Sequence, residues 1–182
     1  IASFYRNTIV HFFLSRAVAE LALLAVSENE KEETALACFW REVRALRDLF
    51  KFEFFYPDSQ TFEAQIDEEL CLEVPDWQHQ LCDSAENGRK ILNTLAPKLA
   101  HVALTVFAEA YSIGADVLMR QANTIDGDQA VFVDLCMSFG KQAYLQRRIS
   151  SEASIGKLLF TNSWKAFMSR GVADSDEDLA QY

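Results

Sequence analysis

The sequence is poor in the residues that break helices. It contains six glycines and three prolines among 182 residues, whereas these two types make up roughly 12% of an average protein. An all-β chain needs many turns, so this scarcity argues against that class and favours long helices. The glycines are also scattered singly, and they form no glycine-rich loop of the kind that binds phosphate.

Basic residues are outnumbered by acidic ones. Lys and Arg number 17 against 27 Asp and Glu, which gives a net charge of -10. This balance argues against nucleic acid as a partner, because its phosphates attract basic surfaces. Residues 61–88 hold eight acidic residues and no Lys or Arg. We interpret this segment either as a solvated face or as a docking surface for a basic partner.

No apolar run is long enough to cross a membrane, which takes about 20 mostly uncharged residues. The best candidate, residues 99–118, contains His101, Glu109 and Asp116. No secretory leader opens the chain either. Because the first residue is Ile1 and not Met, we expect a fragment or a processed product of a longer protein.

The four cysteines form no CxxC pair, and we expect them to be reduced in a cytosolic compartment. Cys71, His79 and Cys82 could supply three zinc ligands, but structural zinc sites normally take four. We therefore expect no metal and no cofactor. His79 and Asp83 are four residues apart and could form an acid–base pair, although a surface pair is the simpler interpretation.

Apolar residues are abundant, with half of the chain hydrophobic and 14 phenylalanines. This excludes disorder and supports one buried core. The sequence predicts an all-α fold, an irregular bundle of about six or seven helices, in a single domain over residues 1–171. Residues 172–182 are predicted to form a flexible acidic tail. Apolar spacing and caps predict helices at about 3–26, 29–50, 59–70, 83–95, 98–122, 128–146 and 151–171, with a loop at 71–84 and a turn at 126–127. The predicted caps are Ser27 for the second helix, Asp58 or Ser59 for the third, and Ser150 or Ser151 for the last.

A polar group interrupts the first apolar helix. It consists of Tyr5, Arg6 and Asn7, with His11 one turn beyond Asn7. Burying Arg6 without a partner would cost several kcal/mol. The group is either the polar end of a core helix or a network that contacts another domain.

A second group lies in the aromatic block at residues 49–56. Lys51 and Glu53 alternate there with phenylalanines, so the helix is predicted to unwind into extended chain. The block either fills the core at a helix end or forms an aromatic surface that meets lipid.

These two groups resemble motifs of the glycerol-3-phosphate 1-O-acyltransferase family. Residues 4–13, FYRNTIVHFF, are similar to the family's Y-Y-R-N-x-[IV]-x-H segment, and residues 51–55, KFEFF, to its K-x-E-[LF]-F stretch. Roughly 40 residues separate the two motifs in both cases. The remaining helices match the family in order and length.

The resemblance implies the C-terminal helical domain of a membrane-associated enzyme of phospholipid biosynthesis. The enzyme would transfer an acyl group from acyl-CoA or acyl-carrier protein to glycerol 3-phosphate, giving lysophosphatidic acid. The segment itself would be soluble and would pack against a catalytic domain of the same chain, at the cytoplasmic face of the cell membrane as a peripheral protein. The implied interdomain contacts are Tyr5, Arg6, Asn7, His11, Lys51 and Glu53.

The catalytic signature of the family, H-x4-D, is missing from these residues. Arg16, Ser84 and Val106 stand five positions after the three histidines. We therefore assign no catalytic residue and predict that the segment alone is inactive. Two alternatives remain open. One is a helical ligand-binding and dimerisation domain of a transcription regulator, and the other is a membrane-surface module that uses the aromatic block.

Overall fold

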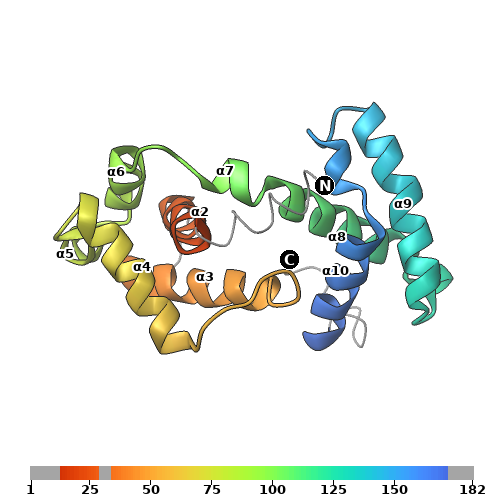
Figure 1. Cartoon of the computed structure of the whole chain (residues 1–182), viewed down its shortest axis with the longest axis horizontal. Coiled ribbons are helices and arrows are strands. Elements are labelled where there is room, and N and C mark those ends of the chain that lie inside the picture. The colour runs from red at the N-terminus through yellow and green to blue at the C-terminus, as the bar shows by residue number, and fades with distance from the viewer. Residues whose placement is uncertain (1–12, 29–33, 172–182) are drawn as a thin grey trace. The chain divides into compact units, whose positions relative to one another are not determined.

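The computed structural model describes residues 13–28 and 34–171, and these residues are almost entirely helical (Figure 1). Within them there are eight α-helices of seven residues or more, and no β-strand. The prediction of an all-α fold is confirmed, with more helices than the six or seven expected. The chain divides into two compact units between Leu104 and Thr105. The single domain over residues 1–171 stays a prediction, and residues 172–182 lie outside the described part.

The first unit is built around helix α2. Helices α3, α4, α6 and α7 all pack against it, and Figure 1 shows α2 nearly end-on among them. The elements of this unit are α2 (Leu14–Glu28), α3 (Ala35–Leu49), α4 (Ser59–Glu73), α5 (Trp77–Asp83), α6 (Glu86–Thr94) and the short α7 (Ala100–Ala103).

Helix α2 is central because it is apolar on nearly every side. Ala17, Val18 and Leu23 are completely buried, and small alanines let neighbouring helices approach closely. Gly88 of α6 provides one such approach, since a Cβ atom there would lie 3.1 Å from the carbonyl oxygen of Leu23. The prediction of a buried first helix is therefore confirmed for most of its described residues, although Phe13 and Leu24 are exposed.

The helix starts show which capping predictions hold. Asp58 caps α4 as predicted, accepting a hydrogen bond from the Thr61 amide at 3.0 Å. The predicted cap of α3 at Ser27 is wrong, because this residue is in the last turn of α2 and its hydroxyl donates to the Leu24 carbonyl. Thr34 caps α3 instead.

The segment predicted as a loop at residues 71–84 contains helix α5. Its apolar residues Trp77 and Leu81 are one turn apart, and both are completely buried. Two buried positions are too few to establish a helical period in the sequence. This short helix accounts for the larger number of helices.

The second unit consists of α8 (Thr105–Ile125), α9 (Gln129–Leu145), the 3-10 turn η2 (Glu152–Ser154) and α10 (Lys157–Ser169), with α8 packed against the other three. The continuous helix predicted at 98–122 is divided at Leu104 into α7 and α8. The predicted turn at residues 126–127 is confirmed, with positive φ at both residues. Ser151 caps η2, not the last helix as predicted, since α10 begins after Gly156.

Candidate functional site

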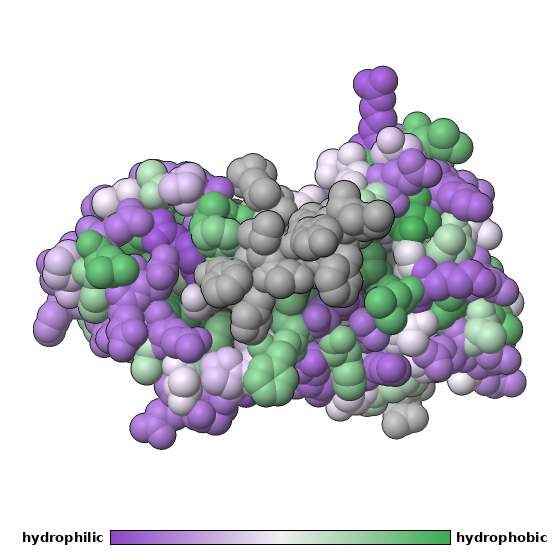
Figure 2. Space-filling model, viewed as in Figure 1, coloured by the Kyte–Doolittle hydropathy of each residue, from purple (hydrophilic) through white to green (hydrophobic). Residues whose placement is uncertain are grey.

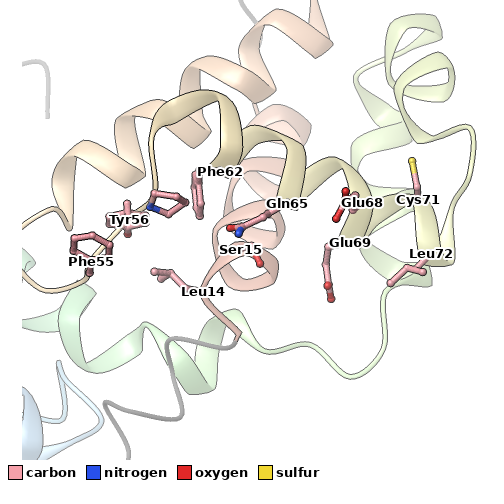
Figure 3. Close-up of a pocket in the computed structure, with 11 residues that line it drawn as sticks. Leu14, Ser15, Phe55, Tyr56, Phe62, Gln65, Glu68, Glu69, Cys71 and Leu72 are labelled. Carbon is pink, nitrogen blue, oxygen red and sulfur yellow. The ribbon is translucent and has the colours of Figure 1, made fainter.

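The first unit contains an open groove of about 890 Å³. Helix α4 forms one wall, and the first turn of α2 and the segment before α4 complete it (Figure 3). Phe62, Gln65, Glu69 and Leu72 line the groove from α4 at a spacing of three to four residues. This spacing places them on one side of the helix.

The groove has two ends of different chemistry. Figure 3 shows Leu14, Phe55, Tyr56 and Phe62 together at one end, and Glu68, Glu69 and Leu72 at the other. The side chains that line the aromatic end are therefore uncharged and mainly apolar, whereas those that line the far end include two carboxylates. We name this feature the α4 groove.

Two large apolar side chains of the α4 groove are open to solvent. Phe55 is 84% exposed and Leu72 is 80% exposed, while Phe62 between them is buried. Figure 2 shows that hydrophilic residues predominate on the viewed surface over α4 and α5, with single hydrophobic residues between them. An exposed leucine and phenylalanine on the rim of one groove are typical of a contact surface.

A buried ion-pair network lies beside the carboxylate end of the groove. Arg16 of α2 is only 4% exposed. Its guanidinium lies 2.9 Å from Glu73 Oε1, 3.2 Å from Glu20 Oε1 and 3.5 Å from Glu69 Oε1. One cation thus joins carboxylates of α2 and α4, and a full positive charge is buried at an acceptable cost because it is paired.

Two carboxylates of this network also hold the segment before α7. Glu20 accepts hydrogen bonds from the backbone amides of Leu99 at 2.9 Å and Ala100 at 2.8 Å, and Glu73 accepts one from the Ala96 amide. The hydrogen bond from Arg16 holds the pKa of Glu73 below its usual value, against the opposing effect of desolvation. The network therefore fixes α2, α4 and residues 96–100 to one another.

The aromatic end contains an unusual pair. The Arg47 guanidinium donates to the Pro57 carbonyl at 2.7 Å and lies 5.7 Å from the centre of the Tyr56 ring. The Tyr56 hydroxyl is buried and has no hydrogen-bond partner among the described residues. Burial raises the pKa of Tyr56 despite the nearby arginine. The phenol is therefore neutral at physiological pH and cannot act as a base.

A thiol, that of Cys71, lies at the other end of the groove. Burial, followed by the charge of Asp67, raises the pKa of Cys71, so this cysteine is a protonated thiol at neutral pH. The chemistry of the α4 groove is therefore that of a binding surface, apolar at one end and negatively charged at the other.

Only two of the predicted site residues lie in the described part of the chain. Lys51 is exposed in the turn after α3, where its Nζ atom lies 2.8 Å from Asp48 Oδ1, and the Glu53 amide donates to the Phe50 carbonyl. The structure brings neither residue into the α4 groove. Tyr5, Arg6, Asn7 and His11 lie outside the described residues.

The aromatic block at residues 49–56 is partly buried and partly exposed. Phe50 and Phe54 are buried, whereas Phe52 and Phe55 are exposed. The block forms a turn, not the predicted extended chain, because the Phe54 amide donates to the Phe50 carbonyl at 3.1 Å. The core interpretation thus accounts for Phe50 and Phe54, whereas contact of the exposed rings with lipid stays a prediction.

The metal and acid–base candidates do not assemble. Among residues 13–28 and 34–171, no three His, Cys, Asp or Glu side chains come together as a metal site. Asp67, whose Oδ1 atom lies 3.8 Å from Cys71 Sγ, accepts hydrogen bonds from Trp77 Nε1 at 3.0 Å and Gln78 Nε2 at 2.6 Å. His79 and Asp83 are both exposed.

The acidic segment at residues 61–88 serves partly as internal structure. Glu69 and Glu73 pair with the buried Arg16, whereas Glu63 forms an exposed pair with Arg44 of α3 at 2.9 Å. The segment is thus not uniformly solvated.

Sequence reasoning missed Arg16 and Glu20, which form the centre of the buried network. A pattern in the sequence could have revealed them. They are the only Lys, Arg, Asp or Glu residues between Arg6 and Glu28, and they stand four residues apart with opposite charge. Such a pair inside an apolar helix indicates a buried ion pair.

Comparison with known proteins identifies the family of this chain. In the described part of the chain, every helix is too short or too polar to span a bilayer. No solved structure matches the chain. The proteins named "Putative acyltransferase plsB1" of Mycobacterium bovis and of Mycobacterium tuberculosis are each 35% identical to it over 184 residues. The match covers the whole chain but only 30% of the length of each relative.

The family described as the glycerol-3-phosphate acyltransferase C-terminal region matches residues 1–176. This match includes both motifs on which the resemblance rests, and it leaves the transcription-regulator alternative without support. The chain belongs to the family of glycerol-3-phosphate acyltransferase C-terminal regions.

Proposed function

We propose that this chain is the C-terminal helical domain of a glycerol-3-phosphate 1-O-acyltransferase of phospholipid biosynthesis. The parent protein transfers an acyl group from acyl-CoA or acyl-carrier protein to the sn-1 hydroxyl of glycerol 3-phosphate. The family match over residues 1–176 carries this proposal. The relatives support it because both are named acyltransferases and extend far beyond the matched part.

The role proposed for these 182 residues is to pack against and support a catalytic domain in the same parent chain. The residues proposed for the interdomain contact are Tyr5, Arg6, Asn7, His11, Lys51 and Glu53. The exposed position of Lys51 supports its part in this contact.

The parent protein is further proposed to work at the cytoplasmic face of the membrane as a peripheral protein. The exposed ring of Phe52, whose centre lies 5.5 Å from the Lys51 Nζ atom, supports this location. Aromatic rings beside a basic side chain are suited to the interface of an anionic membrane.

An assay that measures the incorporation of labelled glycerol 3-phosphate into lysophosphatidic acid tests the proposal. The purified parent protein is expected to transfer, and the 182-residue chain alone is not. Arg6→Ala in the parent protein is expected to lower activity or stability. Arg89→Ala, at an exposed arginine of α6, is the matched control and should change neither. Acyl transfer by the 182-residue chain alone would refute the assignment.

A further inference from the structure

We propose that the α4 groove is the docking site for a basic, apolar segment of the parent chain outside these 182 residues. This inference rests on the proposed function, since it names one contact between the helical domain and the remainder of the acyltransferase. The occupant is defined by its chemistry, as a Lys or Arg side chain with large apolar side chains close to it in sequence.

The charge of the groove selects against anions. Glu68 and Glu69 line it, and Glu73 lies in the network beside it. Within residues 13–28 and 34–171, Arg16 is the only cation in that network, and it is shared among three carboxylates. Phosphate-bearing ligands, including glycerol 3-phosphate, coenzyme A and lipid headgroups, would therefore be repelled. A cationic side chain would be attracted.

One carboxylate of the groove is available for such a cation. Glu69 is 3.5 Å from Arg16 and is already engaged. Glu68 is exposed, and it has no hydrogen-bond or ion-pair partner within residues 13–28 and 34–171. A Lys or Arg of the occupant would pair with Glu68 without breaking an existing contact.

The separation of the apolar side chains along the groove indicates the length of the segment that it can bind. Phe62 and Leu72 are ten residues apart on α4, which corresponds to about 15 Å along the helix axis. An amphipathic helix of about three turns spans this length, and helix-in-groove binding uses apolar contacts at such intervals. Phe55 and Leu72, which are 84% and 80% exposed, would lose their contact with water when the segment docks.

The parent chain is a better source for this segment than a second copy of the domain. This chain carries a net charge of -10, so a second copy would bring mainly negative charge to a negative groove. The relatives have 70% of their length outside the match, because the chain covers 30% of them. A segment of the same polypeptide also docks at high effective concentration.

The test is photo-crosslinking in the full-length parent protein. The crosslinking residue p-benzoylphenylalanine replaces Leu72, and the crosslinked peptides are identified by mass spectrometry. The expected product joins position 72 to a peptide of the same molecule, outside the 182 residues, that contains Lys or Arg beside apolar residues. The matched control places the crosslinker at Ala64, which is exposed on α4 but does not line the groove. It should give no such product.

A charge variant tests the electrostatic part. Glu68→Lys is expected to reduce the crosslinking yield at position 72 by about tenfold, because like charges then meet in the groove. Glu68→Gln removes the attraction without adding repulsion and should reduce the yield less. Equal yields from the wild type and both variants would overturn the charge argument.

The crosslinked product separates this inference from the proposed function. A product at position 72 that contains residues 1–12, a second copy or lipid would overturn the inference. The inference would also be overturned if position 72 gave no product while a crosslinker at Lys51 still reached the catalytic part. In that case the proposed packing of the helical domain against the catalytic domain would stand. If neither position reaches the catalytic part, the proposed packing itself is wrong.

Discussion

The two units fill their centres by different means. In the first unit the central helix α2 carries a buried charged pair, Arg16 and Glu20, that is 4% and 3% exposed. In the second unit the buried polar residues are neutral ones, Ser154, Asn162 and Ser163. Both units have a close approach at a glycine, but the one in the second unit lies between aromatic rings, since a Cβ atom on Gly114 would lie 3.0 Å from the Phe167 ring and 3.2 Å from the Phe132 ring.

This difference predicts which changes each unit tolerates. The first unit depends on a charge balance that joins α2, α4 and the segment before α7, so loss of a charge should affect it most. The second unit depends on the small volume of a residue between rings, so an added side chain should affect it most. Two acidic side chains of α8, Glu109 and Asp116, bridge to other elements of the second unit, and both are only partly buried. The following variants of the 182-residue chain test this contrast.

The largest effect is expected for Arg16→Met. The substitution leaves Glu20 buried with its charge uncompensated, and breaking a buried ion pair in this way costs about 3–5 kcal/mol. Urea unfolding at neutral pH measures the change. Arg44→Met is the control, because Arg44 and Glu63 form an exposed pair worth about 0–1 kcal/mol. Equal losses in the two variants would show that the Arg16 network is no more important than a surface pair.

A smaller loss is expected for Gly114→Val in the second unit. The new side chain would meet the Phe167 ring and Ser163 Oγ at 3.0 Å and the Phe132 ring at 3.2 Å, and overpacking of this kind costs about 1–3 kcal/mol. Thermal unfolding followed by circular dichroism measures it. Ser112→Val adds the same side chain at an exposed position of α8 and should change the melting temperature little. A Gly114→Val variant as stable as this control would contradict the close packing.

The next prediction concerns Glu109 and its contribution to the stability of the fold at different pH values. This carboxylate accepts hydrogen bonds from the Ser150 amide and hydroxyl and from the Ser154 hydroxyl at 2.5–2.7 Å. Desolvation raises its pKa, but these hydrogen bonds together hold the pKa below the usual 4.5. A lowered folded-state pKa stabilises the fold above the unfolded value, and this contribution is lost as the pH falls through the folded value.

Glu109→Gln should therefore lower the stability at pH 7 by about 1–2 kcal/mol and flatten its decline below about pH 4.5. Urea midpoints measured from pH 7 to pH 3 give both quantities. Glu152→Gln, at an exposed acid of the same region, is the control and should keep the wild-type pH profile. An unchanged profile in Glu109→Gln would mean that the carboxylate does not contribute through its charge.

The sequence predicted the α-helical class and most helices because the apolar period is regular over long segments, as in residues 129–145. It failed at α5, where a helix of seven residues offers too few positions for a period. The α4 groove was not predictable, since it joins Leu14 to residues more than 40 positions later. The acidic character of α4 was visible in the sequence. Which of its carboxylates pair with Arg16 and which line the groove depends on tertiary packing.

The smallest effect, and the one of opposite sign, is expected at Tyr56. Its buried hydroxyl has no partner among the described residues, and an unsatisfied buried polar group costs free energy that its removal recovers. Tyr56→Phe keeps the ring beside Arg47, so the variant should be as stable as the wild type or up to about 1 kcal/mol more stable. Tyr144→Phe, at a 40% exposed tyrosine of α9, is the control. If Tyr56→Phe instead loses more than about 1 kcal/mol in urea unfolding, the hydroxyl has a partner, and the aromatic end of the groove is filled even in the isolated chain.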